Sequence, residues 1–295
     1  MKVDNSGGAG GISGAGCVFD INDLGTSYIN QLLTSPSIVS APDQFGLVTF
    51  NLYSTGALQN SKSEPGISLI GYMLDNTHIR LVENQNVDYL GLPMGGTALG
   101  QTGTGTFRTS SLSGSSDVIS TPGVDFNGTV QVAGLLTFNA DGSVSGNFSL
   151  NDFAVQTPQG GSTLAAEVGS ATCASGTAVT PCYTIDASGI GGDGGTGRVT
   201  ITNITDSTAA PIFNYNLQLY LDGNGNAFVL SLDDSDVLAG LSCKQTAGAG
   251  TLNAGSFRGA YATSATGVSV SSKFEFEAVG PVALTESEHS RGTLI

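Results

Sequence analysis

The chain has 295 residues, of which 43 are Gly and only 11% are charged, and its mean hydropathy is +0.12. A net charge of −15 with only nine Lys plus Arg argues against nucleic acid and anionic membrane surfaces as partners, because phosphates need clustered basic side chains. Disordered chains are usually highly charged and poor in apolar residues, so this composition predicts a folded, turn-rich chain with a buried core.

The expected secondary structure is almost entirely β-strand, because β-branched and aromatic residues alternate or cluster along the chain. Short helical turns are expected only at residues 29–35 and 235–241. Asn, Asp and Gly separate the strands and provide the positive φ that tight hairpin turns need, so we expect hairpins in antiparallel sheets. In chain order, strands are expected at residues 48–53, 67–74, 129–138, 198–204, 213–221, 227–232 and 268–279.

The chain repeats itself out of phase with its own ends. Residues 46–108 begin with GLVTF and end with GTFR, and residues 197–258 begin with GRVTI and end with GSFR. Between them YLGL (89–92) matches LAGL (238–241), while GISG and FDIND near the start match SVSG and FSLND at residues 143–152. Self-similarity of this kind indicates that one structural module occurs twice.

The opening third of a copy, which is complete at residues 105–140, is missing in front of Met1. Writing Ile295 before Met1 gives RGTLI followed by MKVDNSGGAGGISG, which matches AGLLTFNADGSVSG in pattern. We therefore predict a continuous module, residues 105–246, and a split module, residues 1–104 plus 247–295. Met1, Val3, Leu294 and Ile295 form the predicted junction, which closes either within the chain or with a neighbouring subunit.

The fold class predicted for these modules is all-β, with two small antiparallel β-barrels. Closure of each sheet would hide the unpaired edges that Gly-rich, uncharged strands otherwise expose. Many short strands without intervening long helices are also compatible with β-sandwiches, which are the alternative.

Cys173 and Cys182 lie in a loop that is longer than its counterpart in the other copy. A disulfide between them would stabilise that loop by about 2 to 3 kcal/mol, and we predict this bond. Cys17 and Cys243 have no equivalents in the opposite copies and could pair with each other, bridge subunits or remain buried thiols.

The search for catalytic residues gives no constellation that would support an enzyme. His78 and His289 are not accompanied by a nucleophile motif such as GxSxG. Two groups of carboxylates are attributed to a strand end and to the wet face of a strand rather than to glycoside hydrolysis. These groups are Asp233, Asp234 and Asp236, and Glu275 and Glu277. We predict a protein that is not an enzyme and holds no cofactor.

One segment resembles a calcium-binding loop. Asp222, Asn224, Asn226 and Asp233 occupy positions 1, 3, 5 and 12 of such a loop. Position 6, however, is Ala227 rather than Gly, and the following residues are typical of a strand. A hairpin turn explains the pattern better, so no metal site is predicted.

The run ADGSVSGNFSLND, the later GRVTI and the segment LYLDGNGNAFVLSLDDSDVLAGL carry a resemblance. They resemble the β-rich repeat domains of large uncharacterised secreted or surface proteins of soil bacteria, which combine a turn like ADGxGxISG with a strand like AFVLxxDxSDVLAG. The resemblance covers residues 105–246 closely and the split copy more loosely. It implies a β-rich extracellular module and brings no catalytic residues.

Two classes of function follow from these observations. We predict a non-enzymatic structural protein of the cell exterior or cell surface, in which a strand from the next copy completes the split module. Its partner is then itself, in a head-to-tail homopolymer such as a filament or surface layer, with no nucleic acid and no membrane insertion. The alternative is a secreted barrel module that binds a small ligand or surface glycan.

Overall fold

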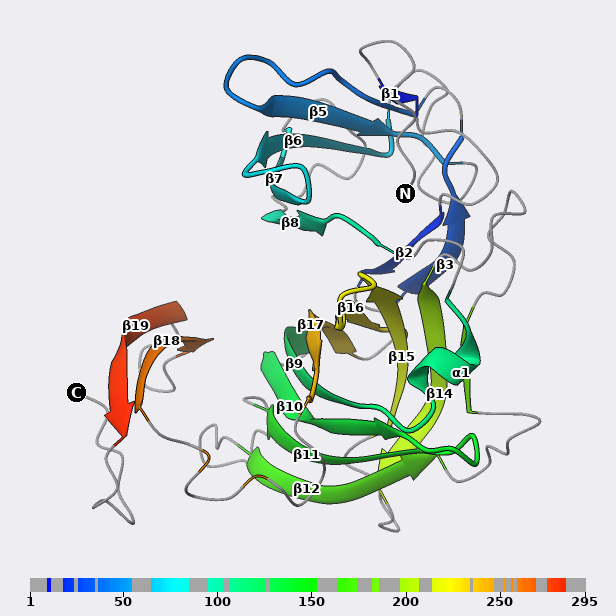
Figure 1. Cartoon of the computed structure of the whole chain (residues 1–295), viewed down its shortest axis with the longest axis vertical. Coiled ribbons are helices and arrows are strands. Elements are labelled where there is room, and N and C mark those ends of the chain that lie inside the picture. The colour runs from blue at the N-terminus through cyan, green and yellow to red at the C-terminus, as the bar shows by residue number, and fades with distance from the viewer. Residues whose placement is uncertain are drawn as a thin grey trace.

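The computed structural model describes residues 10–11, 18–23, 26–34, 37–54, 65–84, 95–102, 107–125, 128–152, 164–173, 182–185, 197–206, 214–233, 236–246, 252, 256, 259–268 and 275–284. Strands dominate these ranges, and the short helix α1 (Thr109–Leu112) is the one helix among them (Figure 1). The predicted all-β class is confirmed. None of the described residues forms a helix that is long and apolar enough to cross a membrane.

One antiparallel barrel is closed. Its sheet has the order β12-β11-β10-β9-β17-β16-β15-β14-β13, and a further pairing between β12 and β14 closes a ring of eight strands, with β13 paired to β14 beside the ring (Figure 1). The strands are β9 (Ser116–Asp125), β10 (Thr129–Phe138), β11 (Val144–Asp152), β12 (Leu164–Cys173), β13 (Tyr183–Ile185), β14 (Arg198–Asp206), β15 (Asn214–Leu221), β16 (Asn226–Ser231) and β17 (Asp236–Lys244). All of them lie inside the predicted continuous module.

The inside of the barrel is filled by apolar side chains, which alternate with exposed or half-exposed ones along strands such as β10 and β16. Val199, Ile201 and Leu219 have no exposed surface, and Val229 is 2% exposed. Phe138 and Tyr183 meet edge to face with ring centroids 5.1 Å apart. This barrel is therefore a packed hydrophobic core.

The remaining described strands form an open sheet and two hairpins. The open sheet has the order β1-β4-β5-β6-β7-β8. Its strands are β1 (Gly10–Gly11), β4 (Ile38–Val39), β5 (Leu47–Leu52), β6 (Ile67–Met73), β7 (His78–Glu83) and β8 (Gly95–Leu99). The hairpins are β2 (Val18–Asp23) with β3 (Thr26–Leu32) and β18 (Gly259–Val268) with β19 (Glu275–Leu284), and the second stands apart from the open sheet (Figure 1). These described strands close one barrel rather than two.

The two predicted helical turns are wrong. Residues 29–32 belong to β3, and residues 236–241 belong to β17. β17 pairs with β16 on one side and β9 on the other, so barrel closure supplies its backbone hydrogen bonds and overrides a local helical preference.

Candidate functional site

Three strands of the open sheet follow the same register as three strands of the barrel. Strands β5, β6 and β7 pair as β14, β15 and β16 do, and the β6–β7 and β15–β16 hairpins have loops of equal length. The matching pairs are Leu47–Tyr72 and Tyr72–Arg80 in the open sheet and Arg198–Tyr220 and Tyr220–Phe228 in the barrel. The GLVTF and GRVTI segments thus begin strands in matching positions.

Backbone details agree with this register. Gly46 and Gly197 precede β5 and β14, and both have a positive φ, +78° and +75°, which favours glycine. A β-bulge follows Phe19 in the β2–β3 hairpin, and a bulge also follows Phe148 in the β11–β12 pair. The FDIND and FSLND segments therefore both lie in the first strand of an antiparallel pair with a bulge after the Phe.

The register also shows which strand of the open sheet corresponds to β17. Arg80 pairs with Thr97 of β8, as Phe228 pairs with Leu241 of β17. Residues 95–99 of β8 thus correspond to residues 239–243, whereas the YLGL segment that the sequence repeat matched to β17 lies outside the described residues.

The C-terminal hairpin has strands of the same length as the β9–β10 hairpin, with a longer connection between them. Both pairs are antiparallel, and the β18 and β19 strands have ten residues each, as do β9 and β10. Each hairpin has a Gly-Val pair near the end of its first strand. We align these glycines: Gly123 pairs with Val130 in one hairpin, and Gly267 pairs with Phe276 in the other. In this alignment VGPVAL of β19 coincides with AGLLTF of β10.

The inner face of the open sheet is apolar but incompletely covered. Its core consists of Leu33, Val39, Val48 and Phe50. Leu69 and Leu81 are only half-buried, whereas Leu217 and Val229, at the matching positions of the barrel, are each 2% exposed. The open sheet therefore exposes apolar surface that the closed barrel hides.

The β2 strand is attached to the outside of the barrel by an ion pair. Arg198 donates from Nε and from one terminal nitrogen to the two carboxylate oxygens of Asp20, at 2.8 and 3.0 Å. Tyr220 donates its hydroxyl to the same carboxylate. The Asp20 side chain has no exposed surface and that of Arg198 is 4% exposed, so this is a buried contact between the two halves of the chain.

Electrostatics at this contact favour the charged pair. Burial opposes protonation of the Arg198 guanidinium, but the hydrogen bonds and the charge of Asp20 raise its pKa above the ordinary value. Burial, followed by the negative charge of Asp20, raises the pKa of the Tyr220 hydroxyl. A second side chain of β2 also contacts the barrel: Asn22 Nδ2 donates to the backbone carbonyls of Ser231 and Asp236 at 3.0 and 2.9 Å.

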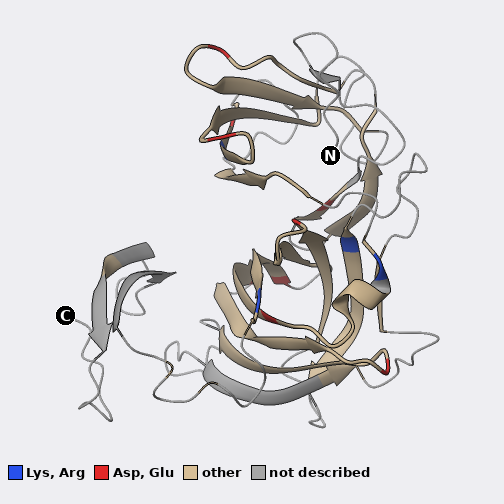
Figure 2. Cartoon of the chain, in the orientation of Figure 1, with Lys and Arg blue, Asp and Glu red and all other residues tan. Residues whose placement is uncertain are grey.

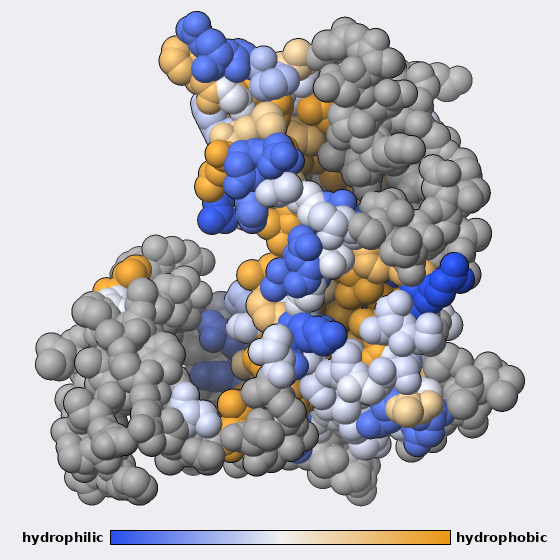
Figure 3. All heavy atoms as spheres, in the orientation of Figure 1, coloured by the Kyte–Doolittle hydropathy of each residue, from blue (hydrophilic) through white to orange (hydrophobic). Residues whose placement is uncertain are grey.

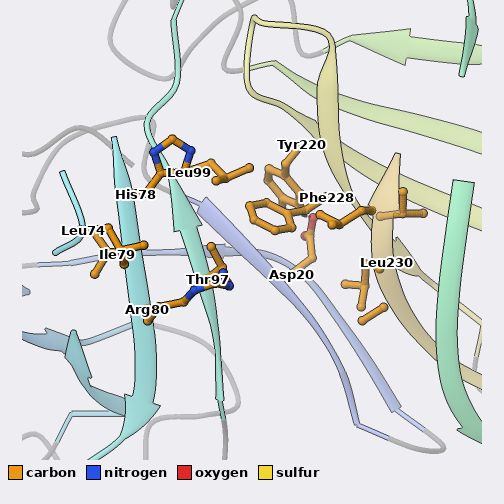
Figure 4. A pocket seen from close by; sticks show the side chains of 14 residues that line it. Asp20, Leu74, His78, Ile79, Arg80, Thr97, Leu99, Tyr220, Phe228 and Leu230 are labelled. Atoms are coloured by element: carbon orange, nitrogen blue, oxygen red, sulfur yellow. Dashed lines mark hydrogen bonds between the residues drawn. The ribbon is translucent and has the colours of Figure 1, made fainter. Parts of the chain in front are cut away.

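A cleft of about 620 Å³ lies between the open sheet and the barrel. Figure 4 shows Leu99 and His78 on one side and Tyr220 and Phe228 on the other. Figure 3 shows hydrophobic residues interspersed with hydrophilic ones on the described surface, and charged residues are few and scattered along the described strands (Figure 2). The lining includes Asp20 of β2 and Thr97 of β8, so both strands border the cleft.

The predicted disulfide is confirmed. Cys173 and Cys182 are bonded and buried, and they join the end of β12 to the start of β13. Cys243 is an exposed thiol, so the alternative of a buried thiol is wrong for this residue. Cys17 lies outside the described residues, as do the predicted junction residues Met1, Val3, Leu294 and Ile295.

The calcium-like loop is a hairpin turn. The Asp222 carboxylate accepts hydrogen bonds from the backbone N–H of Asn224 and Asn226, at 2.6 and 2.9 Å, and from the Asn226 side chain. Although burial opposes it, these hydrogen bonds lower the pKa of Asp222. Asp233 instead accepts hydrogen bonds from Asn216. Within the described part of the chain, no three His, Cys, Asp or Glu side chains gather as a metal site would need.

The other candidate catalytic groups have separate structural partners. His78 is exposed, and its Nδ1 lies 3.0 Å from the Asp75 carboxylate. Hydrogen bonds from Thr77 and His78 lower the pKa of Asp75 below its ordinary value. Asp236 accepts a hydrogen bond of 2.6 Å from Tyr215, away from the Asn216 contact of Asp233. His289 and Asp234 lie outside the described residues, and Glu275 and Glu277 are placed only as strand residues of β19.

The ion pair at Asp20 is a contact that sequence reasoning missed. Its one sequence signal is the Arg of GRVTI, which stands where GLVTF has Leu47. A lone Arg on a strand does not reveal its partner when 178 residues separate the two.

Together these strands define an all-β protein built on a closed, eight-stranded antiparallel barrel with an open sheet beside it. No protein family, curated protein or solved structure matches the chain.

Proposed function

We propose that this protein is a non-enzymatic structural protein of the cell exterior that assembles with copies of itself by β-strand complementation. In this proposal the two halves of the chain are copies of one barrel module. The continuous copy closes by itself, and the split copy is completed by the β18–β19 hairpin of the next subunit. Head-to-tail contacts of this kind do not close, and they generate filaments or layers.

The observation that carries the proposal is the matching register of the open sheet and the barrel. Strands β2, β3, β5, β6, β7 and β8 correspond to β11, β12, β14, β15, β16 and β17. Of the eight strands that close the barrel, β9 and β10 are the two left without a counterpart, and the strands of the C-terminal hairpin have their length and antiparallel pairing. An added hairpin would also cover the apolar face around Leu69 and Leu81.

The disulfide supports a location outside the reducing cytosol, because such bonds form and persist in oxidising compartments. The low content of Lys and Arg, nine residues in all, suits a durable external polymer, because it offers few sites to proteases that cut after basic residues.

A second candidate function is binding of a small apolar ligand, and the cleft is the observation that favours it. Its lining is mostly apolar, with Leu99, Phe228 and Leu241 beside the charged Arg80, as in many ligand sites. Because the closed barrel has a packed interior, we place this alternative at the cleft rather than in the barrel mouth.

The test is the mass and shape of the purified full chain over a wide range of concentrations, by sedimentation and electron microscopy. We expect concentration-dependent particles with a regular axial repeat. A strictly monomeric protein at high concentration would refute the assembly and leave the binding alternative, which saturable binding of an apolar fluorescent dye, weakened by Phe228→Asp, would then support.

A further inference from the structure

We infer that the β18–β19 hairpin of one copy docks between β8 and β2 of the next copy in the register of β9 and β10, with Gly96 and Gly280 at its two joints. That the docked hairpin comes from another copy rests on the proposed function. The inference adds the two strand edges that join, their register and the two glycines that allow the strands to fit.

The joint on the β8 side is indicated by Gly96. Its counterpart in the barrel is Gly240 of β17, where an added Cβ would lie 1.9 Å from the carbonyl oxygen of Ser120 on β9. Only glycine allows the two backbones to approach in this way. A Cβ at Gly96 would meet no heavy atom within 4 Å. In the barrel, the close approach of β9 requires glycine at position 240. The edge strand β8 has glycine at the matching position, 96, although no described strand approaches it there on the side away from β7.

The joint on the β2 side is indicated by Gly280 in the same way. Gly134 of β10 is its counterpart, where an added Cβ would lie 2.3 Å from the Asn147 carbonyl oxygen and 2.6 Å from the Phe148 ring. A Cβ at Gly280 would again meet nothing within 4 Å. The docked register places Gly280 opposite Phe19, the counterpart of Phe148, which is only half-buried here.

Both receiving edges are in place before docking. β8 ends the open sheet, and β2 pairs with β3 alone among the described strands. The outward contacts of Asp20 and Asn22 with the barrel hold β2, and the cleft borders both edges. Pro281 has no amide N–H, so the β19–β2 joint has at most one hydrogen bond fewer than the β10–β11 joint.

The first experiment substitutes the two glycines in the full chain. In Gly96→Ala or Gly280→Ala, overpacking of a joint raises the concentration for half-assembly by roughly tenfold to a hundredfold. The matched controls are Gly95→Ala, which reproduces Ala239 of the barrel, and Val279→Ala, which reproduces Ala133. The controls assemble as the unmodified protein does. Thermal unfolding of the isolated subunits separates a docking defect from a folding defect, and equal assembly of variants and controls overturns the inference.

The second experiment reads the register directly. Leu99 and Ala262 occupy the positions of Cys243 and Val118, which pair in the barrel. We expect Leu99→Cys with Ala262→Cys, in a Cys17→Ser, Cys243→Ser background, to give an oxidised ladder of covalent multimers. The control pair Leu99→Cys with Thr263→Cys gives none, because adjacent strand residues face opposite sides.

The outcomes distinguish this inference from the proposed function. Multimers from the matched pair alone support both. Assembly without a crosslink for the matched pair overturns the register and leaves self-assembly standing. A crosslink confined to monomers shows that the hairpin closes its own chain, which overturns docking between copies and the polymer with it.

Discussion

Asp20 and Arg198 form a two-pronged ion pair on the outside of the barrel, although 178 residues separate them in the sequence. Both side chains are buried, so the pair holds β2 at a fixed place relative to β14. The position of β2 decides which edge of the chain faces the cleft. A contact formed by three side chains thus controls the geometry on which the proposed assembly depends.

The ion pair leads to a stability prediction. Asp20→Leu leaves the buried guanidinium of Arg198 without its carboxylate, and we expect the free energy of unfolding to fall by about 3 to 5 kcal/mol. The double variant Asp20→Leu, Arg198→Leu gives position 198 the Leu that the matching position 47 has. Its free energy of unfolding should fall clearly less than that of the single variant. Urea unfolding followed by circular dichroism measures both, and equal losses would show that the charges are not coupled.

The raised pKa of Tyr220 leads to a pH prediction. Its hydroxyl keeps its proton more tightly in the folded chain than in the unfolded chain, so the folded state is favoured by protonation. The stability that it contributes is complete below the unfolded pKa of about 10 and is lost as the pH rises beyond that value. Tyr220→Phe should therefore flatten the alkaline part of the stability curve. Thermal unfolding between neutral and alkaline pH tests this, with Tyr72→Phe, at the matching position, as the control.

The disulfide should stabilise the barrel at the joint between β12 and β13. Replacing Cys173 and Cys182 together by Ala opens a short ring and should lower the free energy of unfolding by about 3 kcal/mol. A reducing agent should have a similar effect on the unmodified protein and none on the variant. A loss in the variant that reduction does not reproduce would assign the effect to packing of the buried side chains instead.

The sequence repeat predicted the strand pairs better than the closure of the sheets. Local signals specified the hairpins: the Asn, Asp and Gly residues at 222–225 made the β15–β16 turn predictable, and the Gly that opens GLVTF and the Gly that opens GRVTI each have a positive φ just before a strand. Closure depends on long-range pairing such as Ala171 with Asp206, for which a single sequence has no local signal. The helical prediction at 235–241 failed for the same reason.

The predicted junction has the weakest sequence signal of these features. The sequence comparison placed it at Leu294 and Ile295, because RGTLI resembles a strand that precedes a turn. The proposed docking instead places VGPVAL, within β19, at the position of AGLLTF of β10, and Leu294 and Ile295 lie outside the described residues. Apolar residues recur in both segments, so a single sequence does not distinguish them.

The half-covered face of the open sheet gives a final prediction that compares two matched positions. Leu217→Ala removes a buried side chain from the closed barrel and should lower the free energy of unfolding by about 2 to 5 kcal/mol at any protein concentration. Leu69→Ala changes the matching position of the open sheet, where solvent already reaches the side chain. Its effect on a dilute subunit should be clearly smaller.

At high protein concentration, Leu69→Ala should lower the stability of the folded chain by an amount closer to that of Leu217→Ala. If a neighbouring hairpin covers Leu69, assembly stabilises the folded subunit by mass action, and Leu69→Ala loses part of that stabilisation. The difference in melting temperature between Leu69→Ala and the unmodified protein should then grow with concentration, while that of Leu217→Ala stays constant. Constant differences for both variants would mean that Leu69 remains at a solvent-facing surface, which contradicts its burial in a completed barrel.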